Sequence, residues 1–120
     1  MTPNIAAATA FLKCMQAKDL SQAPLAENVS YESPLSGEPI RGRDHVIRFL
    51  NVYLPVINDV RTVRHIADGD YVATVWQADT SFGPLSLIYV FRIESGTIVD
   101  IQAFYDPRGF LERMGKWTVD

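Results

Sequence analysis

The sequence predicts an α+β fold in which N-terminal helices cover one face of a curved antiparallel sheet, a cone-shaped arrangement. Apolar residues recur with the 3.6-residue period of helices in the first half of the chain and with the two-residue period of strands from about residue 61 onward. The final strands, within Ser86–Phe110, are so apolar that another layer must cover them. Only the first half of the chain can supply that layer.

The length of 120 residues predicts one domain, spanning residues 1–120. The net charge of −3 and the lack of a Lys/Arg stripe argue against nucleic acid as a partner. The single cysteine, Cys14, excludes an intrachain disulfide and fits a reducing compartment. No signal peptide is recognisable, and no apolar run reaches the length of about 18 residues that a membrane span needs. We therefore expect a cytoplasmic protein that contacts no membrane.

The first element begins at Thr2-Pro3, a hydroxyl cap followed by proline, and is predicted to be a helix over Pro3–Ala17. Its apolar face comprises Ile5, Ala8, Phe11, Leu12 and Met15. The stretch Leu20–Asn28 is interpreted as a short second helix restricted by Pro24.

Val29–Ser33 alternates briefly before Pro34 and predicts one short strand, and Pro34–Gly42 is expected to be a loop. Asp44 marks the start of the next helix, because a carboxylate is favoured at a helix N-terminus. Pro55 ends or bends that helix, whose apolar face comprises Val46, Phe49, Leu50, Tyr53 and Leu54.

The remaining chain predicts four strands connected as a meander. Asp68-Gly69 is a hairpin signal because that pair tolerates positive φ, and turns are expected at Phe82-Gly83-Pro84 and at Glu94–Thr97. The predicted strands are Arg61–Ile66, Tyr71–Thr80, Leu85–Ile93 and Thr97–Tyr105.

Side chains alternate along a strand, so each strand divides into two faces. We assign the odd-numbered residues of the last three strands to the face beneath the helices. This assignment predicts an apolar cleft whose substrate-binding residues are Phe11, Ser33, Val75, Gln77, Leu87, Ile101 and Tyr105.

The candidate catalytic residues in this cleft are Asp79 and Tyr89. Desolvation raises the pKa of a carboxylate in an apolar cleft, which suits Asp79 to acid/base chemistry, and the Tyr89 hydroxyl can donate a hydrogen bond to a carbonyl. The alternatives are that Asp79 caps the following turn in solvent, that Tyr89 is a core aromatic, and that Ser33 is a turn residue.

The even-numbered residues form an apolar patch on the other face of the sheet, comprising Trp76, Ile88, Val90 and Phe104. A monomer seldom leaves such a patch in water, so we expect a homodimer formed through the sheets. No metal or cofactor is expected: His45, His65 and Cys14 lack ligand spacing, and no Gly-rich phosphate loop is present.

Two segments resemble the nuclear transport factor 2-like superfamily, which includes ketosteroid isomerase, limonene epoxide hydrolase and the SnoaL-like polyketide cyclases. They are VSYESPLSGEPIRGRDHVIRFL (Val29–Leu50) and IQAFYDP (Ile101–Pro107). The resemblance covers nearly the whole chain. It implies a cone-shaped α+β fold in which a curved sheet and helices enclose a pocket, and dimers formed through the sheet.

The catalytic residues of the family carry over poorly. The resemblance places Ser33 where the isomerase has its general-base aspartate, Phe11 where it has a tyrosine, and Tyr89 where it has a protonated aspartate. The epoxide hydrolase set aligns with Gln77-Ala78-Asp79, where only the aspartate is kept, and with Ala103.

Three functions stay open on this basis, and whether the chain is an enzyme stays open with them. The first is a cofactor-independent isomerase, cyclase or hydrolase that acts on a small hydrophobic or carbonyl-bearing molecule. The second is a pocket that binds such a molecule without transforming it. The third is an interaction domain that uses the outer face of the sheet.

Overall fold

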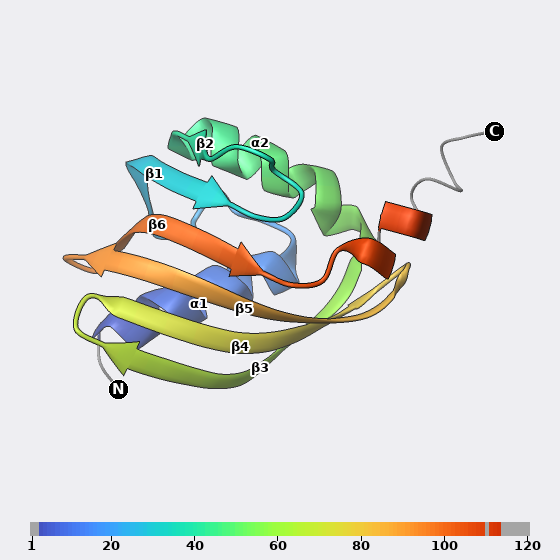
Figure 1. The fold of residues 1–120 in the computed structure, drawn as a ribbon. Coiled ribbons are helices and arrows are strands. Elements are labelled where there is room, and N and C mark those ends of the chain that lie inside the picture. Colours follow the sequence, from blue (N-terminus) through green and yellow to red (C-terminus); the bar gives the residue numbers. More distant parts are fainter. Residues whose placement is uncertain (1–2, 110, 114–120) are drawn as a thin grey trace.

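The structure is a computed structural model that describes residues 3–109 and 111–113 (Figure 1). Among these residues, two α-helices in the first half of the chain and a short 3-10 helix accompany six strands, and residues 108–109 and 111–113 are also helical. In chain order the elements are α1 (Pro3–Ala17), β1 (Leu25–Glu32), β2 (Ile40–Arg41), α2 (Arg43–Tyr53), η1 (Leu54–Val56), β3 (Ile57–Asp68), β4 (Tyr71–Thr80), β5 (Gly83–Glu94) and β6 (Thr97–Phe104).

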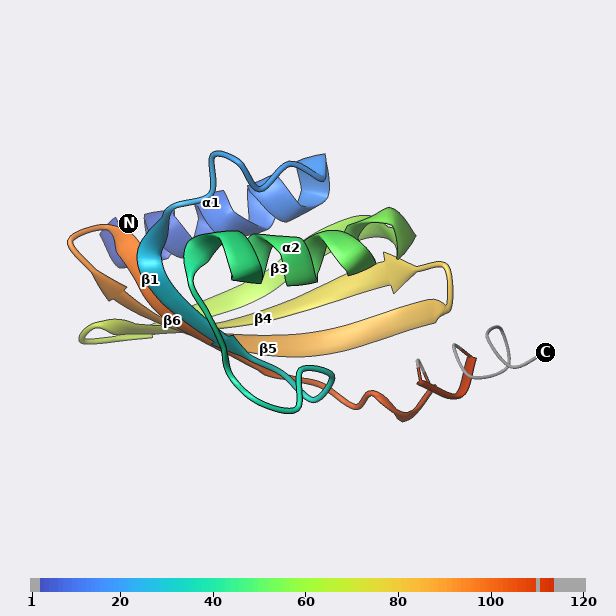
Figure 2. The ribbon, with the colours of Figure 1, turned by 90° about the horizontal axis from the view of Figure 1, so that it is seen from above.

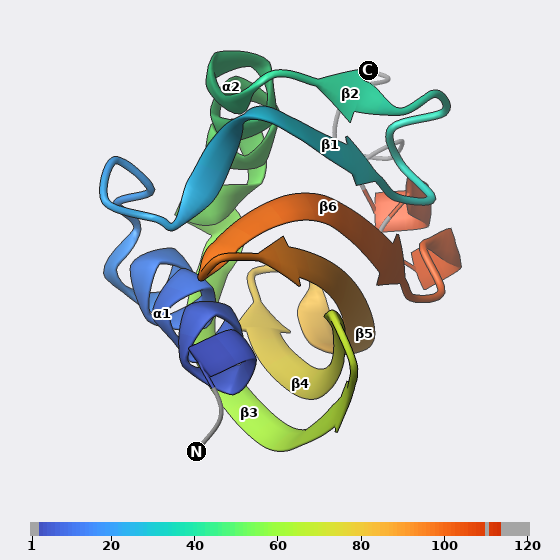
Figure 3. The same cartoon turned by 90° about the vertical axis from the view of Figure 1, so that its left-hand side faces the viewer.

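The six strands form one sheet in the order β2-β1-β6-β5-β4-β3. Neighbouring strands are antiparallel except for β1 and β6, which run parallel. The sheet is strongly curved (Figure 3), and α1 and α2 lie on the same, concave side of it (Figure 2). This arrangement confirms the predicted α+β class with helices on one face of a curved sheet.

The helix boundaries follow local signals. The predicted bounds of α1 are confirmed, and its buried face includes Ala8, Phe11 and Met15. Gly42 precedes α2 with φ of 100°, a backbone conformation that favours glycine, and its carbonyl accepts the N–H of Val46.

The second predicted helix, Leu20–Asn28, is wrong. The chain after Pro24 instead extends as β1, which begins at Leu25 and pairs with β6. This pairing joins segments some 70 residues apart, so local apolar spacing could not reveal it. Part of the predicted loop also forms β2, where Ile40 pairs with Tyr31.

The facing of β4 is the main correction to the sequence analysis. Its even-numbered residues Val72, Thr74, Trp76 and Ala78 are buried, whereas the odd-numbered ones were expected inside. The cause is the length of the turn between β4 and β5. Thr80 pairs with Gly83 across two turn residues, so even positions of β4 pair with odd positions of β5.

The facing of β5 and β6 agrees with the prediction. Leu87, Tyr89 and Phe91 of β5 are buried, as are Ile101 and Ala103 of β6. A register shift between Arg92 and Ile93 brings odd-numbered residues of both strands to the same face. After this shift Phe91 pairs with Ile101, and Tyr89 pairs with Ala103.

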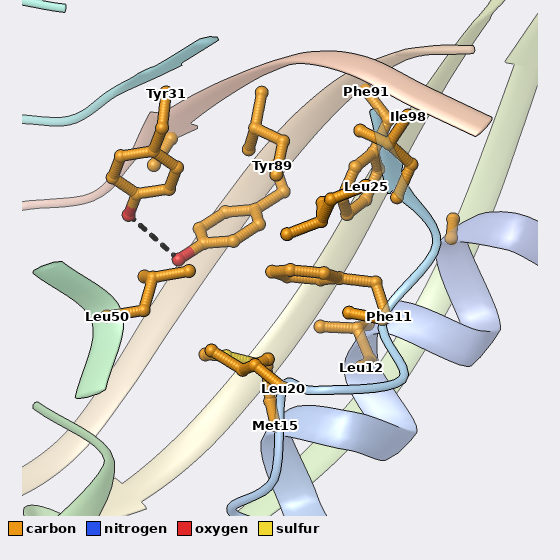
Figure 4. Packing of buried hydrophobic residues seen from close by; sticks show 14 of the residues in the cluster. Phe11, Leu12, Met15, Leu20, Leu25, Tyr31, Leu50, Tyr89, Phe91 and Ile98 are labelled. Carbon is orange, nitrogen blue, oxygen red and sulfur yellow. Dashed lines mark hydrogen bonds between the residues drawn. The ribbon is translucent and has the colours of Figure 1, made fainter. Parts of the chain in front are cut away.

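The core lies between α1 and the concave face of the sheet (Figure 4). Phe11 of α1 packs edge-on against Phe91, with ring centroids 5.6 Å apart, and lies 6.2 Å from the ring of Tyr89. Within residues 3–109 and 111–113, no helix combines the length and the apolar content that crossing a bilayer requires.

Candidate functional site

A largely apolar pocket opens between α2 and the concave face of the sheet, where β4 ends and β5 begins. It encloses about 520 Å³ of empty space, counted with its open mouth. Aliphatic and aromatic side chains line it: Met15, Tyr31, Leu35, Phe49, Leu50, Tyr53, Ile57, Trp76, Ala78, Leu85, Leu87, Tyr89 and Tyr105. Concave apolar sites with few polar groups are the usual form of small-molecule sites.

The most buried polar contact of this pocket joins two phenols. The hydroxyls of Tyr31, on β1, and Tyr89, on β5, lie 3.0 Å apart and form a hydrogen bond (Figure 4). Both side chains are buried. Burial raises the pKa of each phenol above its ordinary value, so both stay protonated at neutral pH. One proton joins the pair, and the Ser33 hydroxyl is a second hydrogen-bond partner of Tyr31.

Two further tyrosines belong to the pocket. Tyr53, at the end of α2, and Tyr105, after β6, are partly buried, and burial raises the pKa of both. Ser33 is buried beside them, and its hydroxyl lowers the pKa of Tyr105 in part by hydrogen bonding. The polar side of the pocket therefore consists of neutral phenols.

Trp76 of β4 supplies one more donor. Its ring stands perpendicular to that of Tyr89, with centroids 5.1 Å apart. Its indole Nε1 is buried without a hydrogen-bond partner among the described residues.

The charged groups that acid/base chemistry requires are missing from this lining. Of the described residues that line the pocket, none is Asp, Glu, His, Lys or Arg. A neutral phenol or indole donates a hydrogen bond and polarises a carbonyl, but it cannot shuttle a proton between carbons as a carboxylate does. The chemistry that the pocket supports is the binding and polarisation of an acceptor.

The prediction that Asp79 lies in the cleft is wrong. Asp79 lies on the outer face of β4, with half of its side chain exposed. Arg61 of β3 donates to both of its carboxylate oxygens, at 2.8 and 3.3 Å, and these hydrogen bonds lower the pKa of Asp79. Arg61 also donates to Asp59, at 2.8 Å.

The other predicted site residues divide into three groups. Leu87, Tyr89 and Tyr105 line the pocket, and Ser33 is not part of the lining but hydrogen-bonds to Tyr105. Phe11 and Ile101 are fully buried in the core and do not line the pocket. Gln77 and Val75 lie on the outer face of β4 with Asp79, because the two-residue turn after β4 turns its odd-numbered residues outward.

The predicted outer patch keeps three of its four residues. Ile88 and Phe104 are 42 and 53% exposed and Val90 is partly buried, but Trp76 is only 1% exposed, on the opposite face. Val75 pairs with Ile88 across the two strands. It therefore takes the place on the outer face that was expected for Trp76. We refer to Val75, Ile88, Val90 and Phe104 as the outer patch.

Sequence reasoning missed Tyr31, Tyr53 and Trp76 as pocket residues. For Trp76 a signal was present, because a two-residue turn between β4 and β5 fixes which positions share a face. For Tyr31 and Tyr53 no local signal could have served, since their neighbours in the pocket come from distant segments.

A second polar cluster lies between α1 and the sheet, away from the pocket lining. The two ring nitrogens of His65, on β3, bond to the hydroxyls of Thr9, at 3.1 Å, and Thr74, at 2.8 Å. Burial lowers the pKa of His65. No group of three or more potential metal ligands is found among the described residues.

Family models and solved structures show what this chain is similar to. A family model described as "Domain of unknown function (DUF4904)" matches residues 4–118. No curated protein matches the sequence.

Solved structures that share the fold include the following three. A steroid delta-isomerase from Pseudomonas aeruginosa has a TM-score of 0.77 at 26% identity, over 98% of this chain and 92% of that one. An NTF2-like protein of unknown function from Cytophaga hutchinsonii has a TM-score of 0.77 at 14% identity, over 90 and 94%. A candidate SnoaL-like polyketide cyclase from Jannaschia sp. has a TM-score of 0.76 at 12% identity, over 98 and 93%. The expected nuclear transport factor 2-like fold is thus confirmed.

Proposed function

The chain belongs to the family described as Domain of unknown function (DUF4904), and from its pocket we propose that it binds a small, mostly apolar molecule that carries a carbonyl-type acceptor oxygen. The observation that carries this proposal is the Tyr31–Tyr89 phenol pair, buried in the wall of an otherwise apolar pocket. The apolar lining favours transfer of the ligand from water, and a phenol of the pair can donate its proton to an acceptor oxygen of the ligand.

The phenol pair is suited to this task because it is protonated and preorganised. Hydrogen bonding between the hydroxyls fixes both rings, so little ordering is needed when an acceptor arrives. Tyr89 also contacts the rings of Phe11, Trp76 and Phe91, which hold it in place.

Binding, with polarisation of the carbonyl, is favoured over proton-transfer catalysis. The steroid delta-isomerase from Pseudomonas aeruginosa shares the fold, and the resemblance places Ser33 where the isomerase family has its general base. A serine hydroxyl does not act as that base at neutral pH. An isomerase, cyclase or hydrolase activity would have to come from carbonyl polarisation alone.

The test uses two probes of matched shape, 4-isopropylacetophenone, which carries one carbonyl, and 1,4-diisopropylbenzene, which carries none. Calorimetric titration measures both dissociation constants for the native chain and for Tyr89→Phe. Loss of the donor is expected to weaken ketone binding about tenfold, as for one hydrogen bond, and to leave hydrocarbon binding unchanged. Tyr71→Phe, at an exposed tyrosine, is the matched control.

Two results would contradict the proposal. One is that neither probe binds the native chain. The other is that Tyr89→Phe weakens ketone and hydrocarbon equally, because the phenol would then contribute only ring packing.

We also propose that the outer patch is a self-association surface. The apolar centre formed by Val75, Ile88, Val90 and Phe104 lies between two charged margins. Arg61 with Asp79 lies on one side, and Arg92 beside Asp100 lies on the other. Each margin carries both signs of charge, so a two-fold-related copy can meet opposite charges around an apolar centre.

A further inference from the structure

The indole N–H of Trp76 is a buried donor that nothing in the described structure satisfies. The side chain is only 1% exposed, and Nε1 has no hydrogen-bond partner among the described residues. A tryptophan N–H that is buried usually finds an acceptor, because leaving it unpaired costs stability. Such a group therefore points to an acceptor from outside the described residues.

The place of Trp76 connects this donor to the pocket. Trp76 lines the pocket from β4 and pairs across the sheet with Leu87, another lining residue. Its ring stands at 90° to that of Tyr89, with centroids 5.1 Å apart. The indole and the phenol pair therefore belong to the same wall of the pocket.

We propose that the ligand carries two acceptor oxygens, one bound by the Tyr31–Tyr89 pair and the other by the indole N–H of Trp76. This inference rests on the proposed function and narrows its ligand class from carbonyl compounds to compact, apolar dicarbonyl compounds. Trp76 is then a specificity-determining residue. An indole N–H can only donate a hydrogen bond. It therefore favours a ligand that offers an acceptor oxygen, and it leaves a hydroxyl or amine proton of a ligand unpaired.

Access to Nε1 requires a small rearrangement, since the atom is buried out of contact with solvent. Met15 belongs to the same lining, and its unbranched side chain changes rotamer at low cost. The ligand thus enters by displacing flexible apolar side chains, and the N–H gains an acceptor from the ligand.

A series of three probes with nearly the same shape tests this inference. 1,4-Diacetylbenzene has two carbonyls, 4-isopropylacetophenone has one, and 1,4-diisopropylbenzene has none. The decisive quantity is the ratio of the dissociation constants of the one-carbonyl and two-carbonyl probes. Comparing this ratio between variants cancels the different costs of removing each probe from water.

Removing the indole donor is expected to abolish the advantage of the second carbonyl. In Trp76→Phe, binding of 1,4-diacetylbenzene should weaken about tenfold relative to 4-isopropylacetophenone. Binding of the hydrocarbon probe reports any loss of affinity that comes from replacing the indole by the smaller phenyl ring. In Tyr89→Phe both ketones should instead weaken relative to the hydrocarbon.

The two proposals therefore fail differently. A ratio that is the same in the native chain and in Trp76→Phe overturns the role of Trp76 and leaves the proposed function intact. Ketones that lose no affinity in Tyr89→Phe overturn the proposed function.

A measurement on the native chain avoids the risk that Trp76→Phe does not fold. In a ¹⁵N-labelled sample the chain shows two indole signals, because it has two tryptophans, and Trp117→Phe assigns them. Saturation with 1,4-diacetylbenzene is expected to move the Trp76 Nε1–H proton signal downfield, as a new hydrogen bond does. Saturation with 1,4-diisopropylbenzene should not. Equal shifts with both probes overturn the inference.

Discussion

The hydroxyls of Tyr31 and Tyr89 lie 3.0 Å apart although the two residues are 58 positions apart in the chain. Each side chain is less than 4% exposed. Among the described residues, the Tyr89 hydroxyl depends on Tyr31 for its hydrogen bond. This dependence makes the pair testable through stability as well as through binding.

Removing one hydroxyl of the pair is expected to destabilise the fold more than the loss of a single oxygen atom suggests. Tyr31→Phe leaves the hydroxyl of Tyr89 buried without its partner, which should lower the free energy of unfolding by about 1–2 kcal/mol. Tyr31→Phe combined with Tyr89→Phe removes both polar groups, so it should cost less than the sum of the single changes. Urea denaturation of the native chain, the two single variants and the double variant measures the coupling energy between the two hydroxyls. Strictly additive effects would show that the pair has no coupling energy.

Stability is expected to depend on pH through His65. Burial lowers its pKa in the folded state, so the unfolded chain takes up the proton first as pH falls. The contribution is fully present above the unfolded pKa of about 6.5 and is lost as pH falls through the lower folded value.

Denaturation midpoints between pH 7.5 and 5.5 measure this effect. His65→Gln should flatten the decline, whereas His45→Gln, at the exposed start of α2, should retain it. A native chain whose midpoint does not change over this range would rule out the proposed dependence.

Asp79→Asn is expected to leave ligand binding unchanged. The carboxylate lies on the outer face and pairs with Arg61, and both side chains are about half exposed. Exposed ion pairs contribute little to stability, so the unfolding free energy should also change only slightly. Titration with 4-isopropylacetophenone measures the dissociation constant. A large loss of affinity would show that the outer face communicates with the pocket.

The outer patch is expected to hold two copies of the chain together. Phe104→Glu places a carboxylate on both partners near the two-fold axis, so it should convert a dimer into a monomer. Val52→Glu makes the same change at an exposed apolar residue of α2, on the other side of the molecule, and should leave the dimer intact. Sedimentation velocity distinguishes these outcomes, and a monomeric native chain would refute the proposed self-association.

The sequence predicts most of the architecture because its signals are local. The proline and apolar spacing of α1, the Asp68-Gly69 hairpin and the alternation of β5 each depend on neighbouring residues, and the structure agrees with all three. The helix predicted over Leu20–Asn28 fails because that segment is shaped by a distant partner, β6.

The candidate site was less predictable, for a reason of geometry. Tyr89 was placed correctly, but one turn inverted β4 and exchanged Asp79 for Trp76 in the pocket. Pairing Thr80 with Gly83 would have corrected this from the sequence. The approach of Tyr31 to Tyr89 could not be predicted, since it requires the path of the whole chain.

The parallel contact between β1 and β6 also constrains when the molecule becomes functional. During synthesis Tyr31 emerges well before the neighbour that pairs with its strand, Thr97–Phe104. Contacts between such distant segments close slowly. The proposed binding pocket therefore forms only after β6 is available, and nascent chains truncated before β6 should be unable to bind a ligand.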